Sequence, residues 1–223
     1  MKNYIYLQAL SQGIGTVLSI GMLLFLSAGT VDYAGAWIFL GTISCCAVVF
    51  ALWLKFKHPK QFENRMYTKE TDRNQRSIVR DIGCFLCCSL VLSGLDRRFS
   101  WSHIPEWRYT IAVALFLASA AVYRNVFIVN PYLSNTVIIH RDHAVIQEGM
   151  YGIVRHPMYL ASFMVYAAGM IMLDTLLLFP LCCGFALLLV RRAKKEEIQL
   201  MTKCQAYKSY MARVKFRLIP YIL

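Results

Sequence analysis

Charged side chains with the chemistry for ligand binding lie where the chain passes from polar to apolar sequence. Arg155 and His156 directly precede Pro157, and the following residues are apolar as far as Leu173. Proline suits the first turn of a helix, because its missing N–H has no partner there and its φ is preset. Amides at a helix start carry partial positive charge. The stretch from residue 148 to residue 159 therefore predicts a site for an anionic or electron-rich group.

A second polar cluster follows the next apolar run. Residues 191–200 contain four basic residues and the adjacent carboxylates Glu196 and Glu197. On a helix, Arg192 lies one turn from Glu196, so one interpretation is a solvated face with ion pairs worth a few tenths of a kcal/mol. The other is a ligand site, in which the carboxylates accept from ribose hydroxyls or an ammonium while Arg155 holds a carboxylate. Proximity of the two clusters would favour the ligand site.

The composition indicates a membrane protein. Hydrophobic residues make up 58% of the 223 residues, against the usual 45–50% of soluble domains. Uncharged runs at 9–28 and 34–54 are long enough to cross a hydrocarbon core of about 30 Å. The net charge of +12 does not indicate nucleic-acid binding, because a basic soluble face would not coexist with such runs.

Four further apolar runs complete a predicted all-α membrane protein of about six spans. They cover residues 82–95, 109–129, 158–173 and 175–190, and the first crosses only if polar residues before it join the helix. The last two form either one long helix or a tight hairpin in which Asp174 or Thr175 caps the second helix. With six spans, 21 of the 24 Lys and Arg residues lie on one side, as the positive-inside rule requires. The charge distribution therefore favours the hairpin, with both termini and the basic loop 55–81 in the cytoplasm.

The eight cysteines do not suggest a metal or redox site. Cys84, Cys87 and Cys88 have the spacing of such a motif, but no histidine is near and the surrounding sequence is apolar. We interpret them as small buried hydrophobic residues and expect no metal.

The two polar clusters together carry a resemblance to a known family. Residues 149–159 read Gly-x-Tyr-x-x-Val-Arg-His-Pro-x-Tyr, and after the predicted hairpin come Glu196-Glu197, Tyr207-x-x-Tyr210 and an Arg-Leu-Ile-Pro tail. This combination resembles the isoprenylcysteine carboxyl methyltransferase family of integral membrane enzymes, and more loosely the phospholipid N-methyltransferases. The motifs span residues 136–220, whereas the first four spans match only in general character.

The resemblance implies an S-adenosylmethionine site at the cytoplasmic side, with a lipophilic acceptor entering from the bilayer. By position, Arg155 and Glu197 would be nearest the methyl transfer. The residues that would line the cofactor pocket are Gly149, Tyr151, Val154, His156, Pro157, Tyr159, Glu196 and Glu197. Met150 and Ala161 replace a proline and a glycine that are frequent in the family. These two departures affect the expected identity of the acceptor more than the expected identity of the cofactor.

Several functional alternatives stay open at the level of sequence. The acceptor could be an isoprenylcysteine-like carboxylate, which needs no base, or a phospholipid amine, for which His156 or Glu197 could act as general base. A membrane reductase of the sterol-reductase type and a non-catalytic lipid-binding protein are the other candidates. Residues 1–130 are expected to form the first four spans and residues 131–223 the catalytic region. The expected partners are a lipophilic or lipidated substrate and membrane lipids, and the oligomeric state is not specified.

Overall fold

The chain folds into helices joined by short connections. The computed structural model describes residues 2–67, 73–130, 145–175 and 177–222. Over these residues the helices are α1 (Lys2–Ala28), α2 (Ala34–Lys57), α3 (Pro59–Tyr67), α4 (Arg73–Phe99), α5 (Arg108–Val129), the 3₁₀ turn η1 (Gly149–Gly152), α6 (Pro157–Met172), α7 (Leu178–Lys203) and α8 (Ala206–Arg213). The predicted all-α membrane fold is confirmed. The sequence favours an extended segment at residues 136–139 and a turn at residues 141–143, and both lie outside the described residues.

Four of the described helices, α1, α2, α4 and α5, are long and apolar enough to cross a membrane. The run at 82–95 lies inside the 27-residue helix α4, so the polar residues before it do join the helix. There, Asp81 is paired with Arg80 at 3.7 Å and with Arg191 of α7 at 3.2 Å. Helix α6 is apolar but has only 16 residues, and α7 combines an apolar half with a charged half. Six spans therefore stays a prediction.

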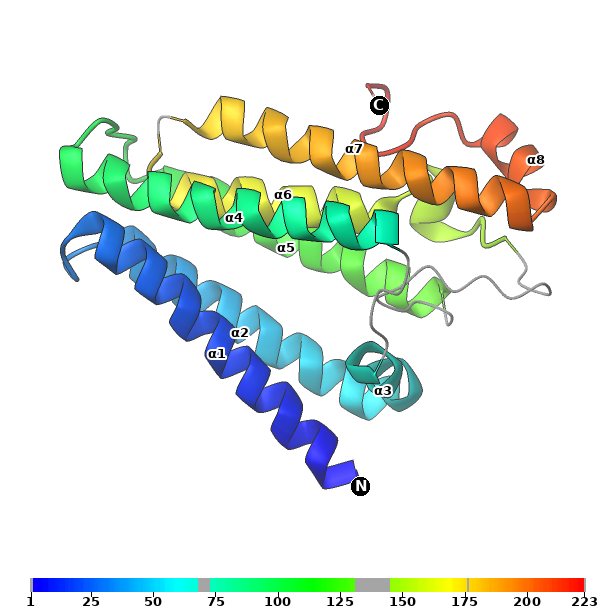
Figure 1. Cartoon of the computed structure of the whole chain (residues 1–223), viewed down its shortest axis with the longest axis horizontal. Coiled ribbons are helices and arrows are strands. Elements are labelled where there is room, and N and C mark those ends of the chain that lie inside the picture. Colours follow the sequence, from blue (N-terminus) through cyan, green and yellow to red (C-terminus); the bar gives the residue numbers. More distant parts are fainter. Residues whose placement is uncertain (1, 68–72, 131–144, 176, 223) are drawn as a thin grey trace.

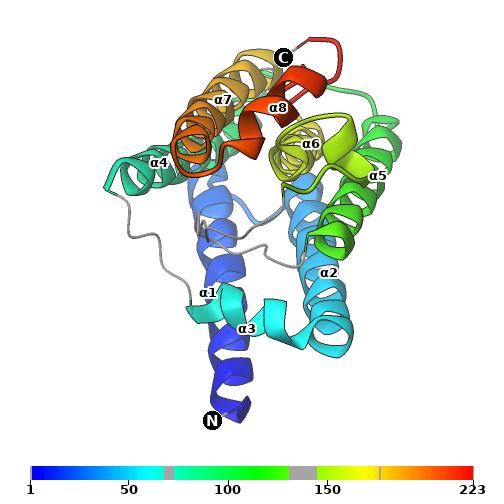
Figure 2. The same cartoon turned by 90° about the vertical axis from the view of Figure 1, so that its right-hand side faces the viewer.

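Helices α4, α5, α6 and α7 run side by side along the long axis of the molecule (Figure 1). The end-on view in Figure 2 shows α1 and α2 extending away from this group, with α3 crossing between them at the far end. The α1–α2 pair approaches the other helices most closely near its own hairpin turn. A Cβ on Gly94 of α4 would lie 1.8 Å from Ser27 Oγ, and one on Gly35 of α2 would lie 2.4 Å from the Met172 carbonyl oxygen. Glycine at these two positions lets the helices touch through their backbones.

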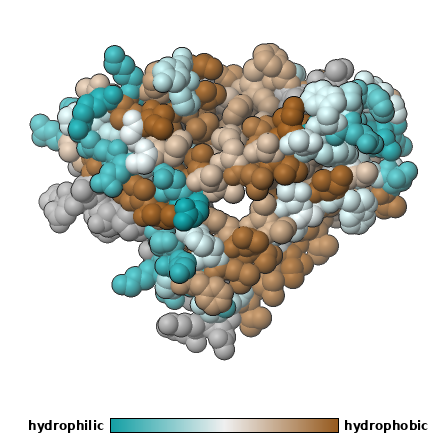
Figure 3. Space-filling model, turned by 180° about the vertical axis from the view of Figure 1, so that it is seen from behind, coloured by the Kyte–Doolittle hydropathy of each residue, from teal (hydrophilic) through white to brown (hydrophobic). Residues whose placement is uncertain are grey.

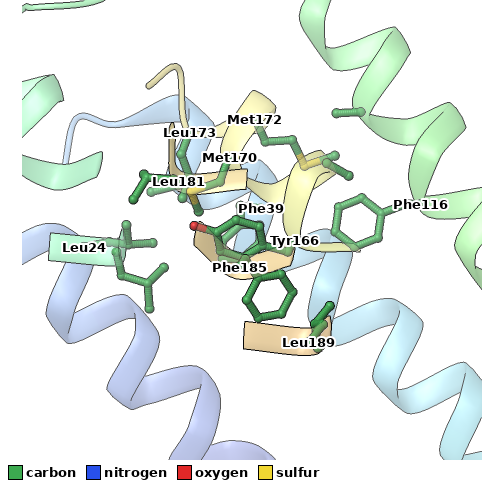
Figure 4. Packing of buried hydrophobic residues seen from close by; sticks show 14 of the residues in the cluster. Leu24, Phe39, Phe116, Tyr166, Met170, Met172, Leu173, Leu181, Phe185 and Leu189 are labelled. Atoms are coloured by element: carbon green, nitrogen blue, oxygen red, sulfur yellow. The ribbon is translucent and has the colours of Figure 1, made fainter. Parts of the chain in front are cut away.

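The hydrophobic core lies where these helices meet (Figure 4). The rings of Tyr166 on α6 and Phe185 on α7 stack with their centroids 4.3 Å apart. The Tyr166 hydroxyl also forms a 2.8 Å hydrogen bond with Ser89 on α4. Leu24 of α1 is fully buried in the same cluster. The core therefore fixes α6 and α7 against both α4 and α1.

The connection between α6 and α7 is a tight hairpin, as predicted, but its capping differs from the prediction. Asp174 has a left-handed backbone with φ of 56°, and its Oδ1 accepts the Ile104 N–H at 2.7 Å. The Thr175 hydroxyl donates to Asp96 at 3.0 Å. Helix α7 begins only at Leu178 and has no side-chain cap. The capping prediction is wrong because Asp174 binds the α4–α5 connection and Thr175 binds Asp96 near the end of α4 instead.

The cysteines of α4 are also placed differently from the interpretation. Cys84, Cys87 and Cys88 are exposed on the surface of the helix rather than buried. In a membrane-spanning helix an outward-facing apolar surface contacts lipid, so a small sulfur-bearing side chain such as that of Cys84 or Cys88 is stable there. Cys87 instead borders a cavity between the helices.

Candidate active site

The turn before α6 is anchored to the end of α5. Gly149 has φ of 58°, a left-handed conformation, and a Cβ there would lie 2.5 Å from Asn125 Oδ1. Both features require glycine. The same Asn125 oxygen accepts the N–H of Met150 at 2.9 Å. Tyr151, one residue on, receives a hydrogen bond on its hydroxyl from the Asn130 amide at 3.0 Å. The 3₁₀ turn thus keeps a fixed position relative to α5.

The tail after α8 pairs with the segment that leads into α6. Val154 forms a parallel bridge with Phe216, and the N–H of Arg155 donates to the Phe216 carbonyl at 2.9 Å. The next N–H, that of His156, donates to the carbonyl of Arg217 at 3.0 Å. These bonds hold the Arg-His pair against the tail, and α6 then begins at Pro157, as predicted.

Glu197 of α7 is the centre of a buried ion-pair network. Its side chain is 3% exposed. Oε1 accepts a hydrogen bond from Arg155 Nε at 2.7 Å and lies 3.3 Å from His156 Nε2. Oε2 accepts from Nε and Nη2 of Arg217 at 2.9 and 2.8 Å. Burial opposes ionisation, but the hydrogen bonds from His156 and Arg217 and the nearby charges outweigh it and lower the pKa of Glu197 to about 2.

Glu196 has a different set of partners. Its Oε1 accepts the hydroxyl of Tyr159 and lies 3.4 Å from Nε of Arg192. Its Oε2 lies 3.6 Å from His156 Nδ1 and accepts no hydrogen bond from the described residues. The ring of Tyr159 stacks on the imidazole of His156 at 5.5 Å, and the Arg192 guanidinium lies 5.4 Å from the centre of the tyrosine ring. Glu196 therefore belongs to the same cluster but keeps one oxygen available.

A large cavity lies beside this cluster. Its volume is about 1220 Å³, and its lining is mostly apolar, contributed by α1, α2 and α4 to α7. Figure 3 shows a hollow bordered partly by hydrophobic surface and partly by more hydrophilic residues in the space-filling view. Tyr159 and Arg192 belong to the lining, and Arg192 is the one charged residue among the described residues that line it. The cavity therefore joins an apolar interior to the polar cluster around Glu196.

Comparisons with known proteins find a similar family model and a similar fold. Residues 110–202 match the model of the isoprenylcysteine carboxyl methyltransferase (ICMT) family. This segment, less than half of the chain, is thus similar to that family. The fold is similar to the solved structure of a eukaryotic intramembrane Ras methyltransferase ICMT, with a TM-score of 0.56 and 18% identity over 93% of this chain and 74% of that chain. No curated protein sequence matches the chain.

The residues predicted from the family resemblance come together in the structure. The segment paired with the tail carries Val154, Arg155 and His156, and Pro157 follows it as the first residue of α6. Glu197 contacts Arg155 and His156. The turn and α6 supply the other members of the family motif, and α7 supplies its carboxylates. Of the predicted residues, only Tyr159 also lines the cavity. Ala161, where the family often has glycine, is fully buried. The roles of these residues in catalysis stay predictions.

Sequence reasoning missed two residues of the site. Arg217 belongs to the Arg-Leu-Ile-Pro motif, yet its bond to Glu197 could not be read from the chain. Arg192 was interpreted only as a partner of Glu196, and that pair is present. A signal existed, because Phe185, Leu189 and Arg192 recur every three to four residues on one face of α7 and all line the cavity. Among the described residues, no cluster of His, Cys, Asp and Glu could hold a metal ion.

Proposed function

We propose that this membrane methyltransferase transfers a methyl group from S-adenosylmethionine to the carboxylate of a lipophilic, isoprenylcysteine-like acceptor at the cytoplasmic membrane face. The observation that carries the proposal is the apolar cavity whose charged lining residue, Arg192, lies beside Glu196 within the family segment. An apolar cavity of this size suits a lipid chain, and a guanidinium suits its carboxylate. In this proposal the catalytic region is residues 131–223, with both termini cytoplasmic.

The polar cluster has the chemistry to hold the cofactor. The available Oε2 of Glu196 can accept from a ribose hydroxyl or an ammonium, the groups expected from the sequence. Glu197 is saturated by Arg155, Arg217 and His156, so it would close the wall of the pocket rather than contact the ligand directly. S-adenosylmethionine supplies an electrophilic methyl group when bound.

Arg192 would orient the acceptor. Its Nε is buried and has no hydrogen-bond partner among the described residues, although the Glu196 carboxylate lies 3.4 Å away. A carboxylate acceptor is already anionic and needs no general base, so alignment is the main requirement of the transfer. An ammonium acceptor would instead meet a positive charge at the end of the cavity. The charge of Arg192 therefore favours a carboxylate over a phospholipid amine.

Arg155 and Glu197 are proposed to act together at the polar end of the site. Besides its bond to Glu197, Arg155 donates through Nη1 to the carbonyl oxygens of Val214 at 3.0 Å and Lys215 at 3.2 Å. Its side chain is thus held by α7 and by the tail. In this position the pair keeps His156 and the neighbouring Tyr159 in place for the transfer.

Methyl transfer from labelled S-adenosylmethionine tests the proposal directly. We expect the purified chain in lipid to label an S-isoprenyl-cysteine carboxylate but not an amine phospholipid. Arg192→Ala should lower kcat/KM for the carboxylate by about 100-fold or more, because a charge-assisted contact is lost. Arg191→Ala is the matched control, since this neighbouring arginine is 53% exposed and pairs with Asp81. Labelling of the amine lipid alone, or of neither acceptor by a chain that stays folded, would overturn the proposal.

A further inference from the structure

Tyr207 of α8 carries a buried hydroxyl that no described residue satisfies. The residue is 5% exposed and packs against Tyr210 and Val214. Among the described residues its hydroxyl has no hydrogen-bond partner. Leaving such a group unpaired costs about 1–3 kcal/mol, and a phenylalanine would avoid that cost. A tyrosine in this place therefore points to a partner outside the described part of the chain.

The neighbouring tyrosine of the same helix provides a direct contrast. Tyr210 lies one turn further on, with its ring centroid 5.5 Å from that of Tyr207. Its hydroxyl donates to the carbonyl oxygen of Tyr151 at 2.7 Å, so it connects α8 to the turn before α6. The two rings share one apolar cluster, but among the described residues the hydroxyl of Tyr210 has a hydrogen-bond partner and that of Tyr207 has none.

The hydroxyl of Tyr207 lies in the field of the buried ion-pair network. Burial is the main cause that raises the pKa of Tyr207, and the negative charges of Glu197 and Glu196 raise it further, while Arg155 acts in the opposite direction. The group consequently stays protonated at every physiological pH and can donate a hydrogen bond. A donor beside the proposed cofactor residues suits an acceptor atom of a ligand.

We propose that the Tyr207 hydroxyl donates a hydrogen bond to bound S-adenosylmethionine, at a ring nitrogen of its nucleoside or at its amino-acid carboxylate. The proposal rests on the proposed function, because it takes the cofactor site to lie between the turn before α6 and the two carboxylates of α7. It makes α8 a direct part of the cofactor pocket. It also distinguishes Tyr207, which would bind the cofactor, from Tyr210, which connects α8 to the turn before α6.

The test measures cofactor affinity and ligand-free stability separately. The probe is S-adenosylhomocysteine, titrated into the full chain in detergent or lipid, and thermal unfolding is recorded without ligand. Tyr207→Phe should weaken binding roughly 3- to 10-fold, the loss expected for one hydrogen bond. Its ligand-free unfolding temperature should not fall. Tyr210→Phe should lower the unfolding temperature, whereas Lys208→Ala, at an exposed position of the same helix, should change neither quantity.

Two results would overturn the inference. If Tyr207→Phe binds S-adenosylhomocysteine as the wild type does, the hydroxyl does not contact the cofactor. If it loses ligand-free stability with unchanged affinity, the partner is within the protein. A wild-type chain that is folded but does not bind would instead overturn the proposed function and the inference with it. Repeating the titration with adenosine locates the contact, because the loss persists for a nucleoside contact and disappears for a carboxylate contact.

Discussion

Arg155 Nε lies 2.7 Å from Glu197 Oε1, and this pair connects the turn before α6 with the charged half of α7. Both side chains are almost completely buried, at 7% and 3% exposed. Burying two charges is costly unless the remaining hydrogen-bonding atoms are satisfied. Here the second oxygen of Glu197 binds Arg217, and Nη1 of Arg155 binds carbonyls of the tail. The network therefore holds three separate segments in one arrangement.

Removing the charge of Glu197 should destabilise the protein strongly. Glu197→Gln leaves the buried guanidinium of Arg155 without its counter-charge, and breaking a buried pair in this way costs about 3–5 kcal/mol. Unfolding of the variant in detergent should show this loss. Glu106→Gln, at an exposed position between α4 and α5, is the control and should unfold as the wild type does. Equal stability of the two variants would mean that the network does not hold the tail.

The stability of the protein should fall in acid because of the same carboxylate. The pKa of Glu197 is lowered from its usual value of 4.5 to about 2 in the folded protein. Its contribution to stability is therefore complete above the unfolded pKa and is lost as the pH falls through the folded pKa. The unfolding free energy of the wild type should decrease between about pH 4.5 and about pH 2 by more than that of Glu197→Gln. Parallel pH profiles of the two proteins would contradict this assignment.

Filling the cavity should impair acceptor binding and leave cofactor binding intact. Val165 of α6 is part of the lining, and Val165→Trp would place a large ring in the proposed path of the lipid chain. We expect the KM of an S-isoprenyl-cysteine acceptor to rise about 10-fold or more, as overpacking by 1–3 kcal/mol implies. The affinity for S-adenosylhomocysteine should change less than about 2-fold. Leu187→Trp is the matched control, because Leu187 of α7 faces outward and is 71% exposed. If both substitutions raise KM equally, the cavity is not the acceptor site.

The polar contacts at the opposite end of the bundle should contribute to stability but not to catalysis. Asp96 is 1% exposed and accepts hydrogen bonds from the hydroxyls of Ser102 and Thr175. Asp96→Ala leaves these donors without an acceptor, at about 1–3 kcal/mol for each buried group. Unfolding measurements should show this loss of stability, while the activity per folded molecule should stay unchanged. Asp32→Ala, at an exposed position, should change neither the stability nor the activity. Reduced activity of folded Asp96→Ala would contradict the prediction that these contacts do not contribute to catalysis.

The helices could be predicted from the sequence, but their ends could not. Residues 82–95 gave too short an apolar run for a span, because Arg80 and Asp81 interrupt it. In the fold, the pairing of Asp81 with Arg191 lets α4 continue through this charged region. Such a pairing depends on which helix lies alongside, and hydropathy along one segment contains no information on its neighbours.

The two polar clusters of the site could be predicted from the sequence, whereas the contacts within and between them could not. The two polar clusters and the hairpin that brings them together followed from motif and charge distribution. The division between Arg155, which is enclosed by Glu197 and the tail, and Arg192, which lines the cavity, depends on how α7 is rotated against α6. Nor could the sequence reveal that the tail forms a bridge with Val154. Such contacts between distant segments arise only from tertiary packing.

The pairing of Val154 with Phe216 also sets the order in which the site can assemble. A chain emerges from the ribosome with its N-terminal part first, so α6 is made long before the segment that holds its start. Glu197 is likewise synthesised before Arg217, its bidentate partner. Until that arginine has emerged, a buried carboxylate lacks part of its counter-charge. We therefore expect the membrane helices to insert before the polar cluster is complete, and activity to begin only when the final stretch of the described chain closes over that cluster.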